Sequence, residues 1–330
     1  MATLYITVPG ARVEKDYKRL IVVKDDEVLI RIPLFRVDQV VLVGSVSITT
    51  QAMQALLLEG KGLTIINQSG RLLGRLVSPT LKNIGLRQKQ YELGQNESFC
   101  LEISKRFIYG KLRNEATMVA RMRRSHPQID GAISKKLHQA LKQVKTAGSL
   151  ADLRGIEGRA ARLYFSAFRL ALDQSWNFGN RSHHPPEDEI NALLGLAYTL
   201  LHENMITSLE VVGLDPYEGY LHADKYGRPA LALDLMEEFR HIIADSVVLH
   251  LVNRSILSPS DFERAGQGYH LKSQAMRKFF KAYQQRLQTE VIHPTYKTRL
   301  SYQKCFEVQA RMLRKVIEGE IQVYVPFITR

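Results

Sequence analysis

The sequence predicts an α+β protein, with a small N-terminal β-sandwich-like domain over residues 1–85 and a larger all-α domain over residues 86–330. Short runs rich in Val, Ile and Thr continue to about residue 77, and after Pro79 the apolar residues recur at helical spacing. Dividing the length of 330 residues by the roughly 150 residues of a typical domain gives about two domains. A chain of this size can bury a core without a disulfide or metal staple.

The N-terminal elements follow from runs of β-branched residues between turns. Strands are predicted over 4–8, 19–23, 27–32 and 39–43, separated by charged or glycine turns. A helix is predicted over 50–59, because Thr49 or Thr50 can cap it and Gly60 can end it. Strands over 62–67 and 71–77 follow, joined by a turn at 68–70. The spacing indicates a small sandwich or a curled antiparallel sheet.

The charge of the chain indicates a polyanionic partner. The net charge is +13 and the pI about 9.7, which is typical of proteins that bind nucleic acid or an anionic surface. Residues 86–150 alone carry +8. A single lysine is usually only part of a solvated helix face, but the regional excess favours contact with duplex phosphates. The excess includes the cluster Arg121, Arg123 and Arg124 and the lysines at 135, 136, 142 and 145.

Several classes of protein are excluded or disfavoured. Two cysteines, Cys100 and Cys305, are too few for a disulfide framework or a cysteine-based zinc site. No N-terminal targeting segment is apparent, and no window approaches the roughly 18 apolar residues of a membrane span. We therefore expect a cytoplasmic protein with no membrane partner.

Glu157 lies in an amphipathic helical segment, at an unusual position. Leu153, Ile156, Ala160, Leu163 and Ala167 mark the buried face, and Glu157 begins an adjacent stripe with Ala161, Tyr164 and Phe168. An inward carboxylate must be protonated, paired or bound to metal. Gly155 and Gly158 leave open space beside it. The simpler alternative is an ion pair with Arg154 or Arg162.

A second polar group follows a loop over 213–220. His222 lies just before a second loop, and a helix is predicted over 230–243, after Pro229. Asp234 and Glu237 are i, i+3 neighbours on this helix and repel each other unless a cation lies between them. The alternatives are acidic residues that favour a helix start and a histidine without a ligand role. His241 is expected on the helix surface.

Carboxylates with one imidazole suit Mg²⁺ or Mn²⁺ better than zinc, and such an ion supports phosphodiester chemistry. No glycine-rich phosphate loop, HExxH motif or nucleophile elbow occurs. The tract His183-His184-Pro185-Pro186 suggests metal binding, but with the acidic residues 187–189 it is more simply interpreted as the start of a helix over 190–201.

These segments strongly resemble the CRISPR-associated adaptation endonucleases, the Cas one family, which inserts new spacers into CRISPR arrays. The resemblance covers nearly the whole chain. Four ordered motifs carry it: GIEGRAARLYF at 155–165, HHPPEDEINALLGLAYTLL at 183–201, GLDPYEGYLH at 213–222 and GRPALALDLMEEFR at 227–240. Both the β domain and the helical catalytic domain agree with the fold of that family.

The resemblance implies metal ligands at Glu157, His222 and Glu237, with Asp234 as a further acidic active-site residue. It also implies a homodimer formed through the β domains, and a small ferredoxin-like partner, the Cas two protein, held between two such dimers. All four active-site residue types are present, so the resemblance implies an active enzyme.

The implied activity is metal-dependent attack of a prespacer 3′-hydroxyl on a phosphodiester of double-stranded repeat DNA. Water would be the nucleophile in a nuclease side reaction. The nearby bases Lys225, Arg228 and Arg240 could neutralise phosphates, although each alone is as readily a plain surface base. Two other functions stay open: a general metal-dependent nuclease or junction resolvase, and a non-catalytic DNA-binding scaffold.

Overall fold

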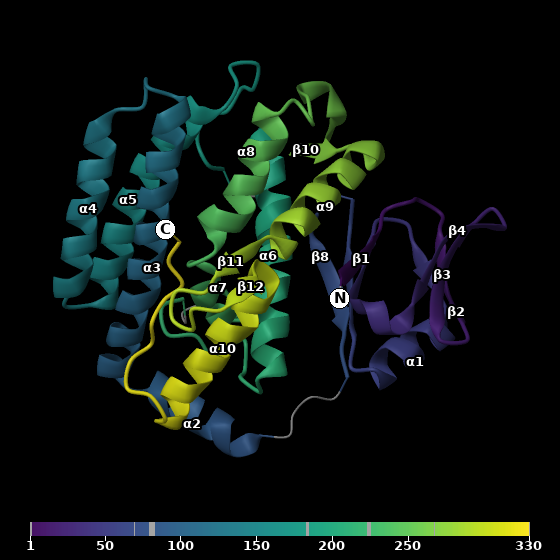
Figure 1. The fold of residues 1–330 in the computed structure, drawn as a ribbon, viewed down its shortest axis with the longest axis horizontal. Coiled ribbons are helices and arrows are strands. Elements are labelled where there is room, and N and C mark those ends of the chain that lie inside the picture. Colours follow the sequence, from purple (N-terminus) through teal and green to yellow (C-terminus); the bar gives the residue numbers. More distant parts are fainter. Residues whose placement is uncertain are drawn as a thin grey trace.

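The computed structural model describes residues 2–68, 70–78, 83–182, 185–222, 226–266 and 268–329. Figure 1 shows a β region formed by the first part of the chain beside a larger helical region. The predicted fold class is confirmed. The last strand of the β region ends at Leu76, and the first helix of the helical region begins at Ile84.

Two four-stranded sheets form the β region. One has the order β1-β5-β7-β8 and the other β4-β3-β2-β6, and Leu20 and Val40 belong to the core between them. The bounds are β1 Ala2–Ile6, β2 Arg12–Asp16, β3 Arg19–Lys24, β4 Glu27–Pro33, β5 Val37–Val43, β6 Ser47–Ile48, β7 Gly62–Ile66 and β8 Leu72–Leu76, with a 3₁₀ turn at Leu34–Arg36.

The sheets are mixed, so the expectation of an antiparallel sheet is wrong in part. β1 and β7 both run parallel to β5, and helix α1 (Thr50–Leu58) is the crossover that a parallel β5–β7 pair needs. Thr49 caps α1 as predicted, by accepting a hydrogen bond from the Ala52 amide at 3.3 Å. The polar segment of β2 had no hydrophobic signal for a strand.

The helical region begins with α2 and ends with α10 (Figure 1). It is not purely helical, because it also contains two short antiparallel hairpins, β9–β10 and β11–β12. The bounds are α2 Ile84–Gly94, α3 Glu97–Ser125, α4 Gly131–Thr146, α5 Leu150–Ala171, α6 Glu189–Val211, α7 Ala230–Met236, α8 Ser246–Asn253, β9 Phe262–Ala265, β10 Gly268–Leu271, α9 Ser273–Gln288, β11 Glu290–Ile292, β12 Arg299–Ser301 and α10 Tyr302–Glu318, with a 3₁₀ turn at Pro259–Asp261.

The predicted helix over 230–243 is interrupted. Helix α7 ends at Met236, a turn follows, and a π-helical turn (His241–Asp245) precedes α8. The segment is buried on all sides, so its apolar residues have no amphipathic period from which the interruption could be predicted. π-helical turns inside helices frequently mark functional sites.

Arg75 on β8 ties the two regions together. Its guanidinium lies 3.0 Å from a Glu203 carboxylate oxygen and forms two hydrogen bonds with the Glu210 carboxylate, at 2.9 and 3.0 Å. Tyr5 on β1 also stacks on Phe280 of α9, with ring centroids 4.5 Å apart. These contacts fix the β region against α6 and α9.

Within the described residues, no helix combines the length and the apolar character needed to cross a membrane.

Candidate active site

Three helices bring two carboxylates to one ammonium group. Lys111 extends from α3, Glu157 from α5, and Glu237 follows the end of α7. The Lys111 Nζ lies 2.5 Å from Glu157 Oε1 and 2.7 Å from Glu237 Oε2. The Glu237 side chain is buried, and that of Glu157 is 18% exposed. Glu157 is therefore the carboxylate of this pair that solvent or a substrate can reach.

The other oxygen of Glu237 is held by Arg240. The Arg240 Nε lies 2.9 Å from Glu237 Oε1, and its guanidinium carbon lies 5.0 Å from the centre of the Tyr198 ring. The Tyr198 hydroxyl donates to Asp245 at 2.6 Å, which fixes the ring. Arg240, for which contact with DNA phosphates was one expectation, is thus paired with a carboxylate of the site.

His222 is oriented by Asp234. The imidazole Nδ1 lies 2.7 Å from Asp234 Oδ1, and the buried Asp234 carboxylate also accepts the amide hydrogens of Tyr220, Leu221 and His222. In the neutral ring, Nδ1 donates to Asp234 and Nε2 carries the lone pair. This is the usual arrangement of a metal-binding histidine with a carboxylate behind it.

The pKa directions show how closely these groups interact. Burial alone would lower the pKa of His222, but the Asp234 hydrogen bond and the charges of Glu237, Asp234 and Glu157 raise it. Burial alone would raise the pKa of Glu237, but Arg240, Lys111 and His222 lower it. Burial alone would lower the pKa of Lys111, but the charges of Glu237 and Glu157 raise it. At neutral pH Glu237 is therefore ionised beside the Lys111 ammonium.

The donor set fits a hard divalent cation. Two carboxylates and one imidazole nitrogen are ligands that Mg²⁺ or Mn²⁺ accepts. Open space is present at Gly158, where a Cβ would meet no side chain within 4 Å apart from its chain neighbours, whereas a Cβ at Gly155 would lie 3.5 Å from the Arg159 guanidinium. Within the described part of the chain, however, no three such side chains already converge as a metal cage. Lys111 lies between the two glutamates instead.

Two expectations need correction. The ion-pair partner of Glu157 is Lys111, 46 positions away, which the sequence analysis did not consider. His241 is buried, although a surface position was expected: its Nε2 lies 3.2 Å from Glu115 Oε1 and its ring 4.3 Å from that of Tyr164. The π-helical turn that contains His241 lies within the core.

Asp234 and Glu237 also differ from expectation in how their charges are satisfied. No shared cation is needed, because Asp234 accepts hydrogen bonds from the 220–222 backbone and His222, while Glu237 pairs with Lys111 and Arg240.

Gly219 allows the 213–220 loop to approach α7 closely, since a Cβ there would lie 2.6 Å from the Ala230 Cβ.

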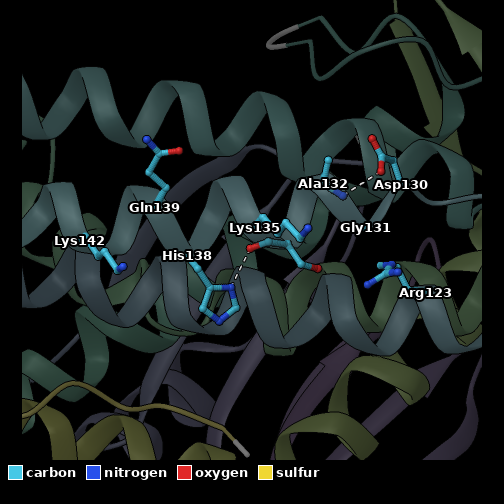
Figure 2. Close-up of a pocket in the computed structure, with 9 residues that line it drawn as sticks. Arg123, Asp130, Gly131, Ala132, Lys135, His138, Gln139 and Lys142 are labelled. Carbon is cyan, nitrogen blue, oxygen red and sulfur yellow. Dashed lines mark hydrogen bonds between the residues drawn. The ribbon is translucent and has the colours of Figure 1, made fainter.

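The basic residues of the 86–150 segment do not form one cluster. Arg121, Arg123 and Arg124 are all exposed, but Arg121 borders a hollow formed with residues 291–294 and 327–329, whereas Arg123 borders another with α4. Figure 2 shows this second hollow, with Lys135, His138 and Lys142 spaced along α4. Asp130 also lines it. Arg123 is about 18 Å along α3 from Lys111.

The remaining predicted bases have different outcomes. Arg228 is half-buried after the second loop, and Lys225 lies outside the described residues, as do His183 and His184. The predicted start of the following helix is confirmed, because Asp188 caps α6 by accepting the Asn191 amide hydrogen at 2.7 Å.

Lys111, Tyr198 and Glu115 were not predicted from the sequence. Lys111 had a usable signal: it lies in α3 with Ile108 and Leu112, both buried, so a lysine there is buried and needs a partner. Tyr198 had no such signal, because α6 is buried on most of its surface and a tyrosine is ordinary there.

The chain is similar in sequence to one family of known proteins. A family profile described as "CRISPR associated protein Cas1" matches residues 4–285. The chain is 39% identical over 305 residues to "CRISPR-associated endonuclease Cas1 3" of Thermus thermophilus, covering 92% of this chain and 90% of that protein.

Two solved structures show the same fold. One is a casposase bound to integration product, with a TM-score of 0.87, 23% identity, and coverage of 98% of this chain and 93% of the casposase. The other is a Cas6-RT-Cas1–Cas2 complex, with a TM-score of 0.84, 24% identity, and coverage of 98% of this chain and 36% of the matched chain.

Proposed function

Because the chain belongs to the Cas1 family of CRISPR-associated proteins, we propose that it is a metal-dependent DNA endonuclease and integrase of CRISPR adaptation. It inserts prespacer DNA into a CRISPR array by attack of a 3′-hydroxyl on a phosphodiester. The observation that supports this most directly is the pairing of Glu157 and Glu237 with one ammonium, at 2.5 and 2.7 Å, together with His222 held through Nδ1 by Asp234.

Each site residue has a role in this proposal. Glu157, His222 Nε2 and Glu237 would hold Mg²⁺ or Mn²⁺, and such an ion polarises a phosphoryl oxygen and stabilises a leaving 3′ oxygen. Asp234 keeps the imidazole in the tautomer that presents Nε2. Since the side-chain hydrogen bonds of Asp234 among the described residues are all with the 220–222 segment, Asp234 is a positioning residue. No covalent enzyme intermediate is needed, because positioning and charge stabilisation supply most of the rate gain.

The proposed partners follow from the surface and from the relatives. Double-stranded DNA, both prespacer and repeat, is the proposed polyanion. A homodimer through the β region is supported by the edge strand β4, where Val28, Leu29 and Ile30 are each more than 40% exposed. A Cas two partner is proposed because the matched Cas6-RT-Cas1–Cas2 assembly contains one.

A joining assay tests the proposed function. We expect purified protein with Mn²⁺ or Mg²⁺ to join a duplex ending in a 3′-hydroxyl to a plasmid carrying a repeat, and a 3′-dideoxy duplex not to be joined. The readout is covalent transfer of the labelled strand to the plasmid. Metal-dependent cutting without joining would instead favour a general nuclease or junction resolvase.

The hollow between α3 and α4 is proposed as part of the DNA track. Replacing Arg123 and Lys135 with glutamine should weaken DNA binding and reduce the slope of log affinity against log salt by about 0.9 for each lost phosphate contact. The matched control replaces exposed Lys18 and Arg19 of the β region, which removes the same charge. Equal slopes for the wild type and the Arg123 and Lys135 variant would contradict this placement.

A further inference from the structure

Lys111 is a buried cation between two proposed metal ligands. Its side chain is 7% exposed, and its Nζ contacts Glu157 Oε1 at 2.5 Å and Glu237 Oε2 at 2.7 Å. These distances place one ammonium in simultaneous contact with carboxylates from two different helices. A divalent cation that uses both carboxylates must approach the same two oxygens or their immediate neighbours.

The charges of the two glutamates are already balanced. Glu237 Oε1 is paired with Arg240 at 2.9 Å, so two cations face the two glutamates. Asp234 keeps its negative charge, but its oxygens are already used by backbone amides and the His222 ring. A divalent cation that binds Glu157 and Glu237 is repelled by Lys111 at short range, where screening is weak.

We propose that Lys111 competes with the divalent metal for Glu157 and Glu237, so that metal loading depends on the negative phosphate brought by bound DNA. The inference rests on the proposed function, since it takes the metal-dependent DNA reaction as its premise. Metal binding moves the ammonium away from at least one glutamate. By linkage, DNA must then strengthen metal binding by the same factor by which metal strengthens DNA binding.

The test measures Mn²⁺ affinity directly, by the electron paramagnetic resonance signal of free Mn²⁺, with no turnover. The proteins are the wild type and Lys111→Met, each alone and with a 3′-dideoxy duplex. Without DNA, we expect Lys111→Met to bind Mn²⁺ at least roughly tenfold more tightly than the wild type. We also expect DNA to increase the Mn²⁺ affinity of the variant less than that of the wild type.

The matched control is Lys105→Met, which removes the same charge from the same helix about 9 Å away, where Lys105 pairs with Glu102 instead. Its Mn²⁺ affinity should equal that of the wild type. If Lys111→Met binds Mn²⁺ with equal or lower affinity than the wild type in the absence of DNA, the inference is overturned.

The inference and the proposed function fail in different ways. If the wild type binds no Mn²⁺ with or without DNA, the metal-dependent function fails as well. If the wild type binds Mn²⁺ and His222→Ala does not, but Lys111→Met is unchanged, only the inference fails.

The wild type also allows a test that does not depend on the folding of a variant. In a crystal structure with bound Mn²⁺, we expect Lys111 Nζ to lie beyond hydrogen-bond distance from at least one of the two glutamates. If both contacts persist beside the bound ion, the inference is overturned.

Discussion

Replacing His222 with alanine is expected to reduce metal-dependent strand transfer on the order of a thousandfold while DNA binding is retained. The imidazole is the one nitrogen donor of the proposed set, and its loss removes transition-state stabilisation of several kcal/mol. DNA affinity should change little, because His222 is only one group beside a basic surface. Joining of a 3′-hydroxyl duplex to plasmid, together with a mobility-shift titration, measures both properties.

A second variant tests the role assigned to Asp234. Asp234→Asn should lower joining by about 10- to 100-fold, because the imidazole loses the carboxylate that orients it. The matched control for His222→Ala is His250→Ala, since His250 is an exposed histidine at the end of α8. Unchanged joining by His222→Ala would support the non-catalytic scaffold, in which the carboxylates serve only as ion-pair partners.

Glu238 is expected to make the stability of the protein strongly dependent on pH. Its carboxylate is fully buried and accepts hydrogen bonds from the Tyr324 hydroxyl at 2.6 Å, the Phe327 amide at 2.6 Å and the Gln309 amide at 2.9 Å. Burial raises the pKa of Glu238 to about 8, because these three hydrogen bonds offset the loss of hydration only in part. Through its hydrogen bonds with Tyr324 and Phe327, Glu238 also connects the C-terminal segment to the core.

The direction of the pH effect follows from this shift. The pKa is higher in the folded state, so the stabilisation is fully present below the ordinary value of 4.5 and is lost as the pH rises through about 8. Between these values the free energy of unfolding should fall by at most about 1.4 kcal/mol per pH unit on this account. His222, whose pKa is also raised, acts in the same direction.

Glu238→Gln isolates the contribution of Glu238. In chemical unfolding with EDTA, from pH 5 to pH 8, the wild type should lose stability more steeply than this variant, because glutamine cannot ionise. The His222 contribution is common to both proteins and cancels in the difference. Parallel pH profiles would show that Glu238 does not titrate across this range.

Periodicity predicted much of the local structure correctly. In α5, four of the five residues expected on the buried face are buried, and Tyr164 and Phe168 of the adjacent stripe are buried too. Prediction was poorer over 230–243, where α7 and the first part of the π-helical turn are buried. A segment without a polar face has no hydrophobic period, so the π-helical turn could not be foreseen.

The sequence by itself determined the order of a β region and a helical region, the concentration of basic charge over 86–150, and the inward position of Glu157. These features depend on neighbours within a few residues, which share one helix face or one strand. Only the tertiary structure decided that Lys111 bridges Glu157 and Glu237, that Asp234 orients His222, and that Arg121 and Arg123 border different hollows. The physical reason is that these contacts join side chains from separate elements, and such pairings leave no local pattern in the sequence.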